Sequence, residues 1–253
     1  MPLVAAIQAA GPKPPQTATR TQKKNYAERL SNEVAKVLAE RLRAHGVKGC
    51  QPDPMQGRER QFAGGIGAKK VDVSFATEVD GLILGISVKS ISFPDKKTMN
   101  YQKNLTNRRG DLLAEATTLH QRFPYAVLGG LFLFDEGASR DNTRRRPSTF
   151  ETAHEIFRAF DERDDRANAV EKYEALGIVL YRAEHPPSFD YYEVGRINPP
   201  QPLDNFLMRL LAKVAERNPD RFRFKDGRLV TRRVVSKARQ QPEDEEATED
   251  DEM

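Results

Sequence analysis

The run AVLGGLFLF at residues 126–134 constrains the fold of this 253-residue sequence more than any other feature. No position in it carries a polar side chain, so both faces of the element that contains it must be buried. The run is far shorter than the roughly 20 residues that a membrane-spanning helix needs. Pro124, just before it, ends the preceding helical segment. We therefore expect a strand at the centre of a sheet that is covered by helices.

Two strands are predicted upstream of this run, at 71–76 and 82–90, with an Asp-Gly turn between them. Side chains alternate along a strand, so Ser87 and Lys89 share one face while apolar residues fill the other. If the hairpin is symmetric about its turn, Asp72 lies opposite Ser87. A lysine rarely points into a packed interior without a partner or a chemical task. The pattern therefore predicts a polar cluster of Asp72, Ser87 and Lys89 on one face of the sheet.

Helical periodicity and capping signals place helices around these strands. The order helix, strand, strand, helix, strand predicts an α/β (α+β) fold with a mixed central sheet flanked by helices. The helices are expected from residue 25 to 42, at 108–123, after a capping box of Ser148 and Glu151, and at 202–218. Further strands are expected at 176–184 and 190–197, and a short hairpin around the Asp-Gly pair at 226–227.

The chain is expected to divide into four parts. Residues 1–23 are predicted to be a flexible arm and 24–135 the core. Residues 136–240 form a C-terminal extension with a helix, a hairpin and basic segments, and 241–253 an acidic disordered tail. Within the core, residues 52–69 are expected to be a loop, because glycine, proline and polar residues dominate them.

Charge is unevenly distributed along the chain. The formal net charge is +4, yet the tail alone carries eight acidic residues, so the rest is strongly basic. A basic body favours a polyanionic partner such as nucleic acid, although basic bodies with acidic tails also occur simply as solubility devices. Cys50 is the sole cysteine, which excludes an intrachain disulfide and a cysteine-rich zinc site. With neither a secretory signal nor a membrane span in the sequence, we expect a cytoplasmic protein.

The predicted cluster and its strand order resemble the PD-(D/E)XK nuclease superfamily over roughly residues 25–135. That family has a restriction-endonuclease-like core of a helix, a three-stranded meander, a helix and a strand, with an aspartate in the second strand and acid-x-lysine in the third. Asp72 matches the aspartate. Ser87-Val88-Lys89 matches the third-strand motif except that serine replaces the acid.

One branch of type II restriction endonucleases shows this same replacement, and the following helix supplies the acid within an Asn-x-Arg-x-Glu pattern. Asn107, Arg109 and Asp111 stand at the same steps here, with aspartate in place of glutamate. We favour Asp111 as the second acid, with Glu115, one turn further on, as the competing candidate. Glu33 corresponds to a first-helix glutamate that is often near the site in the superfamily. For Glu33 we favour the simpler interpretation, that it lies on a solvated helix face.

The resemblance implies a metal-dependent DNA endonuclease. Asp72, Asp111 and the Val88 carbonyl would hold Mg²⁺, for which Mn²⁺ is a substitute, because hard cations prefer oxygen ligands. Lys89 would stabilise the charged phosphate or orient the attacking water, and Ser87 would hydrogen-bond a metal-bound water. The partner expected is double-stranded DNA, and cutting both strands favours a homodimer. A type II restriction or other phage-defence enzyme has this activity.

Two other classes of protein fit the same residues. One is a catalytically inactive DNA-binding subunit with the same fold, which the serine at position 87 allows. The other is a structural or adaptor protein with a basic face. For DNA contact we single out five arginines, although a solvated surface is the alternative for any one of them. These are Arg108, Arg109, Arg144, Arg145 and Arg146.

Overall fold

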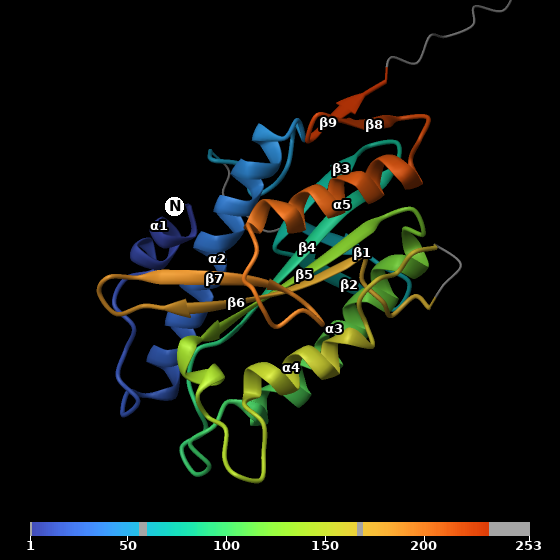
Figure 1. The fold of residues 1–253 in the computed structure, drawn as a ribbon. Coiled ribbons are helices and arrows are strands. Elements are labelled where there is room, and N and C mark those ends of the chain that lie inside the picture. Colours follow the sequence, from blue (N-terminus) through green and yellow to red (C-terminus); the bar gives the residue numbers. More distant parts are fainter. Residues whose placement is uncertain (1, 56–59, 166–168, 233–253) are drawn as a thin grey trace, which may run out of the picture.

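A computed structural model describes residues 2–55, 60–165 and 169–232. A five-stranded mixed sheet runs through the molecule in the order β3-β4-β5-β6-β7 (Figure 1). Its strands are β3 (Val73–Thr77), β4 (Gly81–Ile91), β5 (Val127–Asp135), β6 (Ala175–Arg182) and β7 (Ser188–Glu193). The three middle strands are parallel, and the two edge strands are antiparallel to their neighbours. Every residue of β5 is buried, so the predicted central strand is confirmed.

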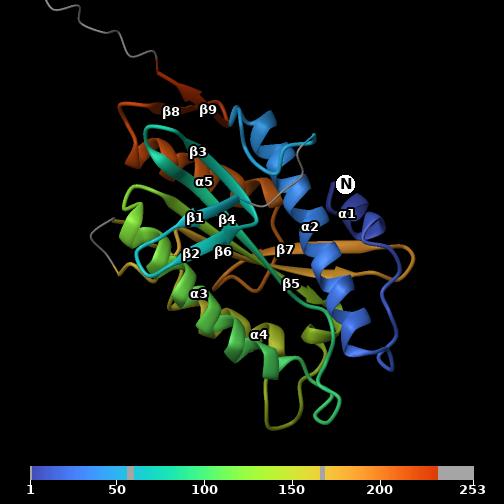
Figure 2. The same cartoon turned by 180° about the vertical axis from the view of Figure 1, so that it is seen from behind.

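Helices cover both faces of this sheet, which confirms the mixed α/β class (Figures 1 and 2). The helices α1 (Pro2–Ala9), α2 (Arg20–Ala44) and α5 (Leu203–Arg217) pack on one face in a first hydrophobic core. On the other face, α3 (Gln102–Arg122) and α4 (Thr149–Arg158) pack in a second core. A short 3₁₀ helix, η1 (Glu136–Ser139), follows β5. The alternation of side chains along β4 thus directs its two faces into two different cores.

Local signals in the sequence explain most helix boundaries. The predicted capping box at α4 is present, because the Glu151 N–H donates to Ser148 Oγ and the Ser148 N–H donates to the Glu151 carboxylate. An equivalent box of Thr19 and Gln22 starts α2 at Arg20, five residues before the predicted start. The helix α3 begins at Gln102, well before the predicted start at 108, and has no side-chain cap. The first N–H of α3, that of Gln102, donates instead to Asn100 Oδ1 at 3.1 Å, just before the N-cap residue.

Three segments differ from the prediction. Residues 2–9 of the expected flexible arm form α1, whose Leu3 and Ile7 are buried against the sheet. Part of the expected loop at 52–69 is a hairpin of β1 (Arg60–Ala63) and β2 (Ala68–Val71), which Phe62 anchors in the second core. The strand predicted at 71–76 is interrupted at Asp72, where the chain passes from the small sheet into the large one.

The C-terminal part adds the strands β6 and β7 to the central sheet. The strand β6 pairs directly with β5, and α5 contributes Phe206 and Leu210 to the first core. The predicted late hairpin is present as β8 (Phe222–Lys225) and β9 (Arg228–Thr231). Its turn at Asp226 and Gly227 has positive φ at both residues, which suits the Asp-Gly pair. The predicted acidic tail at 241–253 lies outside the described residues.

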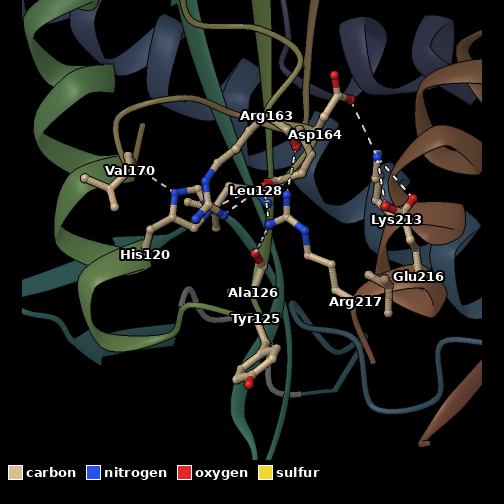
Figure 3. A network of polar contacts seen from close by, with 12 residues as sticks. His120, Tyr125, Ala126, Leu128, Arg163, Asp164, Val170, Lys213, Glu216 and Arg217 are labelled. Carbon is tan, nitrogen blue, oxygen red and sulfur yellow. Dashed lines mark hydrogen bonds and ion pairs between the residues drawn. The ribbon is translucent and has the colours of Figure 1, made fainter. Parts of the chain in front are cut away.

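A buried ion network ties α3, β5 and α5 together (Figure 3). The Glu174 side chain is fully buried and contacts Arg163 at 3.2 Å and Arg217 at 2.5 Å. It also accepts the Leu128 N–H at 2.5 Å. His120 Nδ1 donates to the Val170 carbonyl at 2.8 Å, and its Nε2 lies 3.6 Å from Glu174. Burial alone would raise the pKa of Glu174, but His120 and Arg217 hold that pKa below its ordinary value.

None of the helices in residues 2–55, 60–165 and 169–232 is both long and apolar enough to cross a bilayer.

Candidate active site between β4 and α3

The predicted polar face of β4 is present and faces α3. Val73 pairs with Ile86, which is the hairpin register predicted from symmetry, although a bulge at Phe75 and Ala76 shifts the pairing nearer the turn. Val88 belongs to the first core. Its neighbours Ser87 and Lys89 therefore lie on the opposite face, where α3 packs. Ser87 is 2% exposed, and the Lys89 side chain is 20% exposed.

Glu115 of α3 meets both polar side chains of β4. The Ser87 hydroxyl donates to Glu115 Oε1, and Lys89 Nζ lies 3.1 Å from Glu115 Oε2. Glu115 is 6% exposed. Its two carboxylate oxygens thus have separate partners, which fixes the rotation of the side chain. A carboxylate and an ammonium group buried this deeply are costly unless they are paired in this way.

Asp72 sits beside this pair at the start of β3. The Val88 N–H donates to Asp72 Oδ2 at 2.6 Å. Beyond the last backbone pair of β3 and β4, the carboxylate therefore acts as the hydrogen-bond acceptor in place of a backbone carbonyl. In an antiparallel ladder the N–H and C=O of one residue point to the same neighbouring strand. The Val88 carbonyl consequently points to the same edge as Asp72.

The electrostatics of the cluster couple its three charged groups. Burial raises the pKa of Glu115, and the Asp72 charge adds to the effect against the opposing influence of Lys89. Burial acts to lower the pKa of Lys89, but Glu115 and Asp72 outweigh it and raise that pKa above its ordinary value. The environment of the cluster thus favours the charged form of Lys89 and disfavours the charged form of Glu115.

The other predicted acids lie apart from this cluster. The Asp111 side chain is 54% exposed and pairs with Arg108 at 3.0 Å. The structure thus brings Glu115, and not the favoured Asp111, to Ser87 and Lys89. Glu33 lies on α2, across the sheet, where its carboxylate pairs with Lys36 at 2.7 Å.

The five predicted DNA-contact arginines fall into two groups. Arg108 and Arg109 project from α3, and the Arg109 guanidinium lies over the Phe160 ring at 5.3 Å from its centroid. Arg144, Arg145 and Arg146 lie in the loop before α4, where Thr143 and Arg146 pair as an isolated bridge. Arg144 and Arg145 are exposed, whereas Arg146 is half-buried and donates to the Asp141 carbonyl.

Two residues near the cluster were not anticipated. Lys69 of β2 is half-buried and acts on Glu115 through its positive charge. The Tyr173 hydroxyl donates to the Leu112 carbonyl of α3 at 3.3 Å, and burial raises the pKa of this phenol well above its ordinary value. The lysine pair just before Asp72 was a visible signal for Lys69. Tyr173 gave none, because its segment has no regular pattern.

The oxygen atoms of the cluster suit a hard divalent cation. Asp72 and Glu115 provide carboxylates and Val88 a carbonyl, which is the donor chemistry that Mg²⁺ prefers. Only two of these donors are side chains, and in the described part of the chain no three His, Cys, Asp or Glu side chains gather where they could hold a metal. Any metal here would therefore keep several waters, as Mg²⁺ usually does.

Comparisons of the chain with protein-family models, with curated proteins and with solved structures found no match.

Proposed function

We propose that this protein is a Mg²⁺-dependent DNA endonuclease whose active site consists of Asp72, Ser87, Lys89 and Glu115. The contact of Glu115 with Ser87 and Lys89 carries the proposal. A serine stands where a third-strand acid would be expected, and a carboxylate from the following helix reaches that same place. Glu115 therefore takes the role of second acid in the proposal, and Asp111 does not.

Each residue has a role that follows from its environment. Asp72, Glu115 and the Val88 carbonyl would hold the metal, which when bound neutralises charge on the phosphate and lowers the pKa of a water. Lys89, held charged by its two carboxylate neighbours, stabilises the negative charge that develops on the phosphate. Ser87 keeps Glu115 in its rotamer through the hydroxyl hydrogen bond. The basic surface of the body attracts the polyanion.

A type II restriction or other phage-defence enzyme acting as a homodimer on double-stranded DNA is the biological role that we propose for this activity. A catalytically inactive DNA-binding subunit is the second candidate. One observation favours it: both oxygens of Glu115 already have partners within the protein, so the carboxylate also serves as a structural support for Lys89.

Nicking of supercoiled plasmid separates these candidates. The wild-type protein is expected to nick the plasmid with Mg²⁺ or Mn²⁺ and to show no nicking with EDTA. Lys89→Ala and Asp72→Ala are each expected to abolish nicking while leaving the circular dichroism spectrum unchanged. Lys36→Ala is the matched control, since Lys36 pairs with Glu33 on the exposed side of α2. Wild-type-like activity in either site variant would sink the nuclease proposal. DNA binding without nicking under all metal conditions would establish the inactive subunit.

A salt titration tests whether phosphates are contacted at all. Affinity for a duplex is expected to fall steeply between about 50 and 200 mM salt, because bound cationic side chains release counterions from DNA. A flat affinity over this range would remove both nucleic-acid proposals and favour an adaptor with a basic face.

A further inference from the structure

The N-terminal half of α3 lies on the outside of the molecule (Figure 2), and it carries several exposed polar side chains. Asn104, Asn107, Arg108 and Asp111 recur at steps of three and four, so they form one stripe along the helix. All but the half-buried Arg108 are exposed. A shallow hollow of about 600 Å³ follows this stripe, and Gly110 forms part of its lining. The stripe is thus a shaped surface and not a flat one.

Gly110 is the unusual residue of this surface. It lies in the interior of a 21-residue helix, where glycine costs about 1 kcal/mol relative to alanine. Its φ is not positive, and a Cβ added at this position would meet nothing within 4 Å. Neither the backbone conformation nor the packing of the chain therefore requires glycine here. Its visible effect is to leave the hollow open for the close approach of another molecule.

The chemistry of the stripe suits the edges of bases. Asparagine amides form paired hydrogen bonds with adenine, and arginine does so with guanine, in the major groove of DNA. An α-helix fits that groove. The segment Gln102–Asp111 carries Lys103, Arg108 and Arg109 against the single acid Asp111. Its net positive charge complements the phosphates on either side of the groove.

The stripe is also continuous with the proposed active site. Glu115 lies one helical turn beyond Asp111, so one rigid helix carries both the exposed stripe and the buried acid. A partner seated in the hollow is therefore held at a fixed distance from Lys89 and Glu115. This arrangement suits an enzyme that cuts within or beside the sequence that it reads.

We propose that the stripe of Asn104, Asn107, Arg108 and Asp111, with the hollow at Gly110, reads base pairs of duplex DNA from the major groove. The inference rests on the proposed function, since it names the substrate-reading surface of that site. Asn107 is the residue assigned to an adenine, and Gly110 provides the room for the groove edge to approach.

The first test uses binding in a Lys89→Ala background, so that cleavage does not enter the measurement. Gly110→Ala is expected to raise the melting temperature, because alanine is the better helix former, and yet to weaken duplex affinity. Gly110→Leu is expected to weaken affinity by about tenfold or more, in line with the loss of one good base contact. A Gly110→Leu protein that binds duplex DNA like its parent would overturn the proposal, whether or not the wild-type protein proves to be a nuclease.

The second test measures sequence preference by selection from a random duplex library. Asn107→Ala is expected to flatten the preference at an adenine position, and Asn32→Ala, at an exposed asparagine of α2 on the other face of the sheet, is expected to leave the preference unchanged. An unchanged preference in Asn107→Ala would contradict base reading by this helix. Tighter binding of an RNA hairpin than of any selected duplex would likewise contradict it, while plasmid nicking would still report separately on the nuclease proposal.

Discussion

Ser87 of β4 donates its hydroxyl hydrogen to the carboxylate of Glu115 on α3, across 28 residues of sequence. This bond joins the central sheet to the helix that packs on it, at a place where both partners are buried. Removal of the hydroxyl in Ser87→Ala leaves one carboxylate oxygen without a donor, so we expect a loss of about 2 kcal/mol in the free energy of unfolding. Chemical denaturation measures it.

Ser74 of the neighbouring strand provides a matched control for that substitution. It is 1% exposed, and its hydroxyl has no hydrogen-bond partner among the described residues. Ser74→Ala is therefore expected to be neutral or slightly stabilising. Equal losses in both variants would show that the Ser87 bond contributes nothing specific.

Glu115 and Asp111 lie one turn apart on α3, but Glu115 is buried and Asp111 is exposed. The variants Glu115→Gln and Asp111→Asn should therefore differ in nicking activity. We expect Glu115→Gln to lower Mg²⁺-dependent nicking by about 100-fold or more, because it removes a metal-binding carboxylate at the site. Asp111→Asn alters the proposed reading stripe, but at saturating DNA it should keep nicking within about threefold of wild type, because its carboxylate is exposed, pairs with Arg108 and holds no metal in the proposal. Initial nicking rates at saturating Mg²⁺ decide between the two acids, and the reverse ranking would restore Asp111 as the metal ligand.

Mg²⁺ binding should strengthen as pH rises. Burial raises the pKa of Glu115, so more of this carboxyl group is protonated in mild acid than an exposed glutamate would be. Since a metal binds the ionised form, binding must release this proton, and affinity must rise with pH. Calorimetric titrations in two buffers of different ionisation enthalpy count the released protons. Glu115→Gln should abolish the release, and an equal count in this variant would assign the proton to another group.

His154 should make the fold sensitive to acid. Burial lowers the pKa of His154 to about 4 from 6.5, and its Nδ1 accepts the Gly195 N–H at 3.0 Å. A lowered pKa contributes stability that is present above pH 6.5 and is lost as pH falls through about 4. The full contribution corresponds to about 3 kcal/mol.

We therefore expect His154→Gln to lose less stability than wild type between neutral pH and pH of about 4, as measured by urea unfolding at each pH. His185→Gln, at an exposed histidine, is the control and should follow the wild-type curve. Parallel curves for all three proteins would remove His154 as the source of acid sensitivity.

The ion network of Figure 3 contains two kinds of pair that should differ in energy. Glu174→Gln leaves Arg163 and Arg217 buried with a neutral partner, so we expect a loss of about 3–5 kcal/mol. Lys213→Ala removes contacts to Asp164 and Glu216, whose side chains are 79% and 58% exposed, and should cost less than about 1 kcal/mol. Thermal and urea unfolding of both variants measure the difference, and similar losses would contradict a special role for burial.

Alternation along β4 and symmetry about the Asp-Gly turn were sufficient to place Ser87 and Lys89 on one face with Asp72 beside them. Both depend on rules that act over a few residues. The choice between Asp111 and Glu115 depends on how far α3 slides along β4 and how it is rotated. Packing sets these two quantities, and rules that act over a few residues do not give them.

The helix α1 and the β1–β2 hairpin were not predicted, and the reasons are related. The helix α1 was missed because prolines follow it at positions 12, 14 and 15, and they made the whole of residues 1–23 resemble a flexible arm. A helix of eight residues is too short to be stable alone, and Leu3 and Ile7 stabilise it by packing in the first core. The β1–β2 hairpin has few apolar residues, and Phe62 and Val71 hold it in the second core. In both cases tertiary contacts stabilise an element that is too short to form by itself.

The position of Asp72 at the junction of two sheets ties its carboxylate to the strand that carries Lys89. Asp72 Oδ2 accepts the Val88 N–H of β4, and Lys89 is the next residue of the same strand. Because β4 both carries the cation and holds the acid, a displacement of this strand moves the two groups together and preserves their separation.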